Sequence, residues 1–122
     1  MVQQGRGKIV NVASVAGLVG RSQMAPYAAS KGALIQLTRS LAVEWARYNV
    51  QINALCPGYF RTAMNQHFLD GEAGRRYIRQ AVPLRRAARP AELGPVVVFL
   101  ASAASDFITG AHLVVDGGRL AH

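Results

Sequence analysis

Three short apolar segments, separated from one another by stretches of helical pattern, constrain the fold of this chain more than any other feature. The first, 8–13, is an almost continuous apolar run with three β-branched residues, and comparable runs cover 50–55 and 111–115. Continuous apolar runs are typical of strands that are buried on both faces of a sheet. Because strands and helices alternate, we expect an α/β protein whose parallel strands are joined by right-handed crossovers.

The strongest helical pattern runs from Pro26 to Tyr48. Proline suits the first turn of a helix, and large apolar residues then recur every three or four positions, at Leu34, Leu37, Leu41, Trp45 and Tyr48. Small residues on the same segment would permit close contact with a strand or with the same helix of a second copy; they are Ala28, Ala29, Gly32, Ala33 and Ala42. We therefore expect a long helix over 26–48 that is also a candidate interface.

Weaker helical patterns cover 63–69 and 71–81, and a further one covers 90–105. Proline lacks a backbone donor and clashes with the preceding helical turn, so we expect the regular part of the last helix to begin only at Pro95.

Composition limits the compartment and the partners. The chain has 122 residues, enough for one domain, and a single cysteine, Cys56, so an intrachain disulfide is excluded. We interpret Cys56 as a packed thiol. The longest apolar run, 96–101, is far shorter than the ~20 residues of a membrane span, so we expect a cytoplasmic protein without membrane association. No metal site is predicted, because metal-ligand spacing is absent among the histidines, which are His67, His112 and His122.

The formal net charge is +8, and six of the twelve arginines fall within 75–89. A basic cluster of this kind is one mark of nucleic-acid binding. However, Tyr77 is the only aromatic residue among these arginines, and no nucleic-acid-binding motif accompanies them. We favour a solvated helix face or ion pairs, and we expect no nucleic-acid partner.

Ser14, Tyr27 and Lys31 form the candidate catalytic group. Ser14 follows the first apolar run, and a loop with two glycines leads to Tyr27 and Lys31 at the start of the long helix. Residues four apart share one face of a helix, so the Lys31 ammonium would lie close enough to Tyr27 to stabilise a phenolate. A tyrosine in that position can act as a general acid or base. Taken alone, the pattern is short, and a packed tyrosine beside a solvated lysine is the simpler alternative.

Pro57, Gly58 and Thr62 follow the second strand. Pro57-Gly58 predicts a turn, and Thr62 is a candidate N-cap of the next helix. A role in binding a ligand is an alternative for both.

Four segments together resemble the short-chain dehydrogenase/reductase superfamily. They are Gly7-Lys8-Ile9-Val10-Asn11-Val12-Ala13-Ser14, Tyr27-Ala28-Ala29-Ser30-Lys31, Asn53 through Pro57-Gly58 to Thr62, and Ile108-Thr109-Gly110 to Asp116-Gly117-Gly118, in the order and spacing of that family. The resemblance implies the C-terminal half of a Rossmann-type doubly wound parallel sheet, with about three strands and flanking helices. It extends to gluconate and polyol dehydrogenases and to 3-oxoacyl-ACP reductases alike, so the substrate is not specified.

The resemblance also implies an NAD(P)-dependent oxidoreductase that interconverts a secondary alcohol and a ketone by hydride transfer. Tyr27 matches the general acid/base, Ser14 the group that hydrogen-bonds the substrate oxygen, and Lys31 the residue that binds the nicotinamide ribose. The cofactor-binding residues that it implies are Tyr27, Lys31, Pro57, Gly58, Phe60 and Thr62. The choice between NAD and NADP is not readable, because the segment that decides it in the family has no counterpart here.

The nucleotide-binding half of the family domain has no counterpart in this sequence. The only Gly-x-Gly, Gly5-Arg6-Gly7, precedes a strand, whereas the dinucleotide fingerprint follows a strand and opens a helix. We therefore expect residues 1–122 to be a single partial dinucleotide-binding domain without its N-terminal half. In such a domain the strand over 8–13 would lie exposed at a sheet edge.

Two hypotheses follow from the resemblance. The first is an oxidoreductase, or a piece of one, whose active form needs the other half, so that this chain alone has weak or no activity. The second is a catalytically inactive remnant that acts as an oligomerisation or interaction module. In both cases the family implies a homo-oligomer formed through the helix 26–48 and the C-terminal strand.

Overall fold

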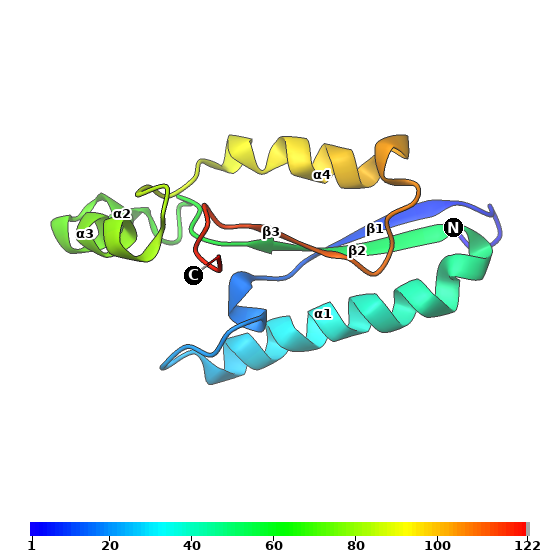
Figure 1. Ribbon diagram of the computed structural model, residues 1–122, viewed down its shortest axis with the longest axis horizontal. Helices are drawn as coiled ribbons and strands as arrows, with labels where there is room; N and C mark the ends of the chain where they lie inside the picture. Colours follow the sequence, from blue (N-terminus) through cyan, green and yellow to red (C-terminus); the bar gives the residue numbers. More distant parts are fainter. Residues whose placement is uncertain (122) are drawn as a thin grey trace.

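The computed structural model describes residues 1–121 and contains one three-stranded sheet (Figure 1). β1 (Gly7–Val12), β2 (Val50–Pro57) and β3 (His112–Val115) lie side by side in that order, and both neighbouring pairs are parallel. At the carboxyl end of β1, Val12 lies opposite Leu55. The predicted parallel α/β arrangement is confirmed, and the second strand extends to Pro57, beyond its predicted end at Leu55.

Two helices cover opposite faces of the sheet (Figure 1). α1 (Ala25–Trp45) packs on one face and continues through a 3₁₀ turn, η2 (Ala46–Tyr48), so the predicted helix over 26–48 is confirmed. α4 (Gly94–Ala101) lies on the other face. It begins one residue before Pro95, because a proline fits within the first helical turn.

Short 3₁₀ turns flank α4 on both sides: η3 (Pro90–Glu92) before it and η4 (Ala103–Ser105) after it. The regular helix therefore ends before the predicted limit at residue 105. The reason is local, because the Ser102 side chain accepts a hydrogen bond from the backbone of Ala104 and caps the new turn.

α2 (Gln66–Asp70) and α3 (Glu72–Ala81) lie beyond the carboxyl ends of the strands (Figure 1). They pack around a small apolar cluster of their own, formed by Leu69, Ile78 and Val82. Open α/β sheets bind ligands outside the carboxyl ends of their strands, so this helix pair lies at the end of the sheet where a site is expected.

The core follows the central strand. All residues from Ile52 to Cys56 are buried in β2, whereas the residues of β1 are only half-buried and Val12 is 52% exposed. The expectation that the first strand is buried on both faces is therefore wrong. Its expected position at a sheet edge is confirmed, because within residues 1–121 β1 pairs with β2 alone. Among the described residues, the outer edge of β1 pairs with no strand, and this explains the exposure.

The inward face of α1 also differs from the predicted apolar stripe. Its buried residues are Ile35, Thr38 and Ala42, spaced three and four apart. Leu34 packs only at the border of the core, and Leu37 is 50% exposed. The face toward the sheet therefore carries smaller side chains, and the large apolar residues continue from the border onto the outer flank of the helix.

Polar side chains inside the sheet are all paired within the described part of the chain. Asn11 donates from Nδ2 to Thr38 Oγ1 at 2.9 Å, which links β1 to α1. Asn53 in β2 donates to the Ile108 carbonyl at 2.8 Å and accepts from the Ala111 amide at 3.0 Å. Asn53 therefore holds both ends of the turn that leads into β3.

We expect Asn53→Ala to destabilise the chain by about 2 kcal/mol, because it leaves a half-buried carbonyl and a half-buried amide without partners. Urea unfolding followed by circular dichroism measures the effect. Gln51→Ala is the matched control in the same strand: the Gln51 amide bonds only the exposed Asn49 side chain, so we expect a loss below ~1 kcal/mol. Equal losses in the two variants would contradict the role of Asn53.

An ion pair closes the loop between α3 and α4. Arg86 Nη1 lies 2.9 Å from Glu92 Oε2, and the Arg89 amide donates to the same oxygen at 2.8 Å. The hydrogen bond from Arg86, with that from the Arg89 backbone, lowers the pKa of Glu92 from 4.5 to about 2. Because the folded pKa is depressed, this stabilisation is complete above pH 4.5 and is lost as the pH falls toward 2.

We therefore expect Glu92→Gln to lose stability at neutral pH, with the difference from the parent chain vanishing as the pH falls through that window. Urea unfolding at a series of pH values measures this difference. Glu44→Gln, at an exposed position on α1, serves as the control whose pH dependence stays that of the parent. A Glu92→Gln difference that persists unchanged at the acid end would rule out the ion pair as its source.

Within residues 1–121, no helix is long and apolar enough to cross a membrane, and no group of ligating side chains is arranged to hold a metal ion. His122, one of the three histidines considered above, lies outside the described residues.

Candidate active site

Ser14 lies immediately beyond the carboxyl end of β1 and is buried. It is the N-cap of a 3₁₀ turn, η1 (Val15–Gly17), and its Oγ accepts the Ala16 amide at 3.1 Å. That bond uses an oxygen lone pair and leaves the hydroxyl proton free. The local fold thus fixes Ser14 in an orientation from which it can still donate a hydrogen bond.

Tyr27 and Lys31 occupy the first two turns of α1. Lys31 Nζ lies 5.7 Å from the centroid of the Tyr27 ring and donates to the Val12 carbonyl at 2.9 Å. Tyr27 is 44% exposed. The predicted pairing of the two side chains is present in the structure, and the Val12 carbonyl ties the ammonium to the end of β1, two residues before Ser14.

Gly17 makes the approach of η1 to α1 possible. A Cβ at this position would lie 2.6 Å from the Lys31 carbonyl carbon and 2.8 Å from the Gly32 nitrogen. These are backbone atoms of a helix and cannot move aside separately. The absence of a side chain at Gly17 therefore sets the distance between the segment that carries Ser14 and the helix that carries Tyr27 and Lys31.

Pro57 ends β2, and Gly58 follows it with its amide bonded to the Val115 carbonyl at 2.9 Å. A Cβ on Gly58 would lie 2.7 Å from the Asp116 Cβ and 2.8 Å from its Cα. The family resemblance accounts for this glycine by implying that the Pro57-Gly58 turn binds a cofactor. The structure provides a second reason, which is the close approach of the chain after β3.

Phe60 and Thr62 differ in which of their atoms could contact a cofactor. The Phe60 side chain is buried, and its backbone forms a bridge with Ala88, so only main-chain atoms of this residue could contact a cofactor. Thr62 is exposed, and its amide is bonded to Asn65 Oδ1 at 2.8 Å. The N-cap of α2 is Asn65, so the alternative that Thr62 caps this helix is wrong.

A cluster of two arginines and two tyrosines lies beside these segments and was not among the predicted site residues. Arg21 Nη2 donates to the Tyr77 hydroxyl at 2.8 Å, and Arg21 Cζ lies 5.4 Å from the centroid of the Tyr59 ring. Arg119 Cζ lies 5.0 Å from the same ring, and the two tyrosine hydroxyls are 2.8 Å apart. Stacking on aromatic faces holds both guanidinium groups in place.

This cluster is built from segments that also carry the predicted site residues. Arg21 belongs to the loop between Ser14 and Tyr27, and Tyr59 directly follows Gly58. Within residues 1–121, neither Arg21 nor Arg119 forms an ion pair with a carboxylate. The only sequence signal for it was an arginine inside a glycine-containing loop, because the partners are distant in the chain.

The two tyrosines respond differently to this environment. Burial raises the pKa of Tyr59, and its hydrogen bond with Tyr77 raises it further. Burial acts in the same direction on Tyr77, but hydrogen bonds from Tyr59 and Arg119 outweigh it, so the pKa of Tyr77 is lowered. The lowered pKa of Tyr77 is therefore a result of the hydrogen bonds that its oxygen accepts, and Arg21 donates one of these bonds.

Cys56 is the penultimate residue of β2 and is fully buried. Burial raises the pKa of its thiol, although a hydrogen bond from the Ser14 backbone acts in the opposite direction. A buried, protonated thiol is a poor nucleophile. The interpretation of Cys56 as a packed residue is confirmed.

A parallel sheet in this order, with helices on both faces, is part of a Rossmann-type fold, as the sequence predicted. The family described as Enoyl-(Acyl carrier protein) reductase matches residues 1–119. The 5-keto-D-gluconate 5-reductase of Escherichia coli K12 is 45% identical over 120 residues, which cover 98% of this chain and 47% of that protein.

Two further proteins extend the comparison. The gluconate 5-dehydrogenase of Gluconobacter oxydans is 43% identical over 97% of this chain and 46% of its own length. A solved structure of a gluconate 5-dehydrogenase from Burkholderia cenocepacia, in complex with NADP and tartrate, superposes with a TM-score of 0.94 at 43% identity, over 99% of this chain and 48% of that one.

The chain therefore belongs to the short-chain dehydrogenase/reductase superfamily, as the sequence motifs predicted, and is of an enzyme family. It spans about half the length of the curated relatives that it matches.

Proposed function

We propose that this chain forms the catalytic half of an NAD(P)-dependent oxidoreductase that interconverts a ketone and a secondary alcohol, with Tyr27 as general acid/base. The observation that carries the proposal is the position of Lys31, bonded to the Val12 carbonyl and 5.7 Å from the Tyr27 ring. The ammonium therefore lies beside the Tyr27 ring, on the same face of α1. In this proposal the Tyr27 hydroxyl exchanges a proton with the substrate oxygen, as a general acid or base does.

Each of the three side chains has a separate task in this proposal. Ser14 donates its free hydroxyl proton to the substrate oxygen and orients it. In reduction, Tyr27 gives its proton to that oxygen as the carbonyl carbon accepts a hydride, and the product is the alcohol; oxidation is the reverse. Lys31 uses one proton for Val12, which leaves two for the hydroxyl groups of a cofactor ribose.

A nicotinamide cofactor fits the residues present, and when bound it supplies or accepts the hydride. Lys31, the Pro57–Gly58 turn, the Phe60 main chain and the Thr62 hydroxyl would hold its nicotinamide end. Support comes from the described complex of the Burkholderia cenocepacia relative with NADP. The adenine and pyrophosphate would be held by a complementary half, so residues 1–122 act as one partial dinucleotide-binding domain.

We further propose that the substrate carries a carboxylate, as a sugar acid does. Arg21 and Arg119 present two guanidinium groups without acidic partners, oriented by Tyr59 and Tyr77 beside the proposed site. Guanidinium groups held in this way suit the recognition of a carboxylate. Three relatives support the same class, because their names or bound molecules refer to gluconate, keto-gluconate or tartrate.

Completing the domain tests the proposal. The N-terminal half of the Escherichia coli relative would be supplied as a separate chain or fused ahead of Met1, and nicotinamide absorbance would be followed with 5-keto-D-gluconate and with an uncharged ketone. We expect turnover with the keto acid and little with the uncharged ketone. No turnover in a complex shown to be folded and to bind NADPH would contradict the proposed chemistry, whereas equal turnover of both would contradict only the carboxylate preference.

A catalytically inactive interaction module is the second candidate, and the outer flank of α1 favours it. Leu37 is 50% and Val43 is 81% exposed on this helix, so an apolar surface is available for a homo-oligomer. The completed protein described above distinguishes the two candidates, because an inactive module gives no turnover there. Titration of the isolated chain with NADPH, followed by nucleotide fluorescence, tests whether a complementary half is needed. We expect no saturable binding by the chain alone, and binding in the micromolar range would show that no complementary half is needed.

A further inference from the structure

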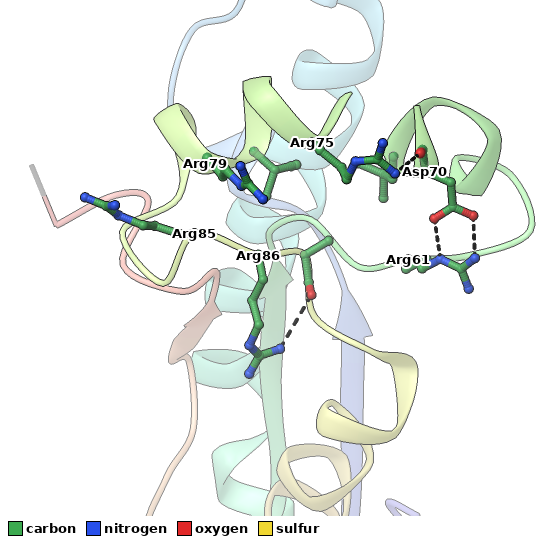
Figure 2. A pocket seen from close by; sticks show the side chains of 9 residues that line it. Arg61, Asp70, Arg75, Arg79, Arg85 and Arg86 are labelled. Atoms are coloured by element: carbon green, nitrogen blue, oxygen red, sulfur yellow. Dashed lines mark hydrogen bonds and ion pairs between the residues drawn. The ribbon is translucent and has the colours of Figure 1, made fainter. Parts of the chain in front are cut away.

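A hollow of about 250 Å³ lies between α2, α3 and the loop that follows α3. None of its lining residues belongs to the proposed active site. Its rim is strongly basic: besides Asp70, it carries five arginines, which are Arg61, Arg75, Arg79, Arg85 and Arg86. Figure 2 shows Arg75 and Arg79 neighbouring one another along α3, with Arg61 and Arg85 toward opposite ends of the hollow.

The charges around this hollow are only partly compensated. Arg61 Nε lies 2.9 Å from Asp70 Oδ1, and Arg86 is paired with Glu92 outside the rim. Within residues 1–121, Arg79 and Arg85 form no ion pair. The rim therefore carries five arginines and one carboxylate, and the carboxylate of Glu92 lies beyond it.

The arginines of α3 that lack acidic partners lie on one side of the helix. Arg75 and Arg79 are four residues apart and flank the buried Ile78 on the side of the hollow. Like charges at this spacing destabilise a helix. Arg76, which does not line the hollow, is instead paired with Glu72 at 3.0 Å. The outward arginine has an acidic partner, whereas within the described residues Arg75 bonds only the Asp70 backbone carbonyl and Arg79 pairs with no carboxylate.

We propose that this hollow is a binding site for a compact anion with at least two negative charges, such as pyrophosphate or a small phosphate ester. Guanidinium groups pair with phosphate oxygens through two parallel hydrogen bonds. Arg61 and Arg86 are held in place by their carboxylates, so part of the site is already ordered. The volume lies below the usual range of drug-sized or cofactor-sized pockets, which favours a compact ligand. Leu69 and Ile78 form an apolar floor that could receive the organic part of an ester.

Calorimetric titration of the 122-residue chain with inorganic pyrophosphate tests the proposal, at low ionic strength because exposed charges are screened by salt. We expect saturable binding at one site, with sodium chloride of equal ionic strength giving no signal. Arg79→Gln should weaken the affinity about tenfold, since it removes one charge-assisted contact. Arg76→Gln is the matched control: it removes the same charge from the same helix, and we expect a change below about twofold.

A second variant and a second ligand complete the design. Arg85→Gln, in the loop, should weaken binding like Arg79→Gln, so the result does not depend on the integrity of α3. Phenyl phosphate is compared with inorganic phosphate: tighter binding of the ester indicates an organic phosphate as the ligand, and equal binding indicates an inorganic one. Equal losses of pyrophosphate affinity in Arg76→Gln and Arg79→Gln would show that only the net charge of the chain matters. A comparable loss of affinity in Lys31→Gln would show that the anion binds in the proposed dehydrogenase site. Either result, or the absence of saturable binding, overturns the proposal.

Discussion

Tyr27→Phe is expected to reduce turnover at least a hundredfold in a protein completed by the N-terminal half of a relative, because general acid–base catalysis contributes about 10²- to 10⁴-fold. The substitution removes only the hydroxyl group. The ring remains over Lys31, so the binding of a cofactor through the lysine should persist. We therefore expect kcat to fall while the KM for NADPH stays nearly unchanged, measured from nicotinamide absorbance.

Tyr48→Phe is the matched control for this experiment. Tyr48 lies in η2, at the opposite end of the long helical segment, and its hydroxyl has no proposed part in the chemistry. Turnover should remain that of the parent. If Tyr27→Phe retained full turnover in the completed protein, Tyr27 could not be the proton donor. The proposed family chemistry would then require a different residue.

Gly17→Ala is expected to destabilise the chain by about 2 kcal/mol and to lower turnover of the completed protein by an order of magnitude or more. The added Cβ would lie 2.6 Å from the Lys31 carbonyl carbon, so η1 and α1 must separate. That separation moves Ser14 away from Tyr27 and Lys31. Urea unfolding gives the change in stability, and steady-state rates give the change in turnover.

Gly20→Ala provides the comparison, because the same loop contains both glycines and a Cβ at Gly20 would have no atom within 4 Å. We expect a change in unfolding free energy within about 0.5 kcal/mol and normal turnover. Similar losses at both positions would show that flexibility of the loop matters, and not the contact between Gly17 and the helix backbone.

The order of strands and helices could be predicted from the sequence because the central strand is buried from Ile52 to Cys56, and such a strand has a largely apolar sequence. The degree to which each strand is buried could not be predicted from the sequence. β1 has an equally apolar sequence, yet Val12 is 52% exposed, because exposure at an edge depends on which elements lie next to the strand. Leu37 shows the same limit for a helix, because it belongs to the predicted apolar face and is still half exposed. Periodicity indicates an apolar face but not how much of that face the sheet covers.

The pairing of Tyr27 with Lys31 could be predicted because four residues make one helical turn and no distant contact is involved. The structural reasons for the glycines at positions 17 and 58 could not be predicted from the sequence. A side chain at position 17 would clash with the backbone of α1. A side chain at position 58 would clash with Asp116, which comes 58 residues later in the chain. Likewise, only the folded chain brings Arg21 and Arg119 to the same tyrosine ring.

The bridge made by Asn53 has a consequence for the order in which the protein assembles during synthesis. Its two partners are 55 and 58 residues further along the chain, and Lys8 of β1 bonds Ser105, 97 residues away. The sheet is therefore held by contacts of large sequence separation, which form slowly. Until residues 108–111 have left the ribosome, β2 lacks its third strand and Asn53 lacks both partners. We expect nascent chains shorter than this to remain protease-sensitive and to depend on chaperones that bind unpaired strands.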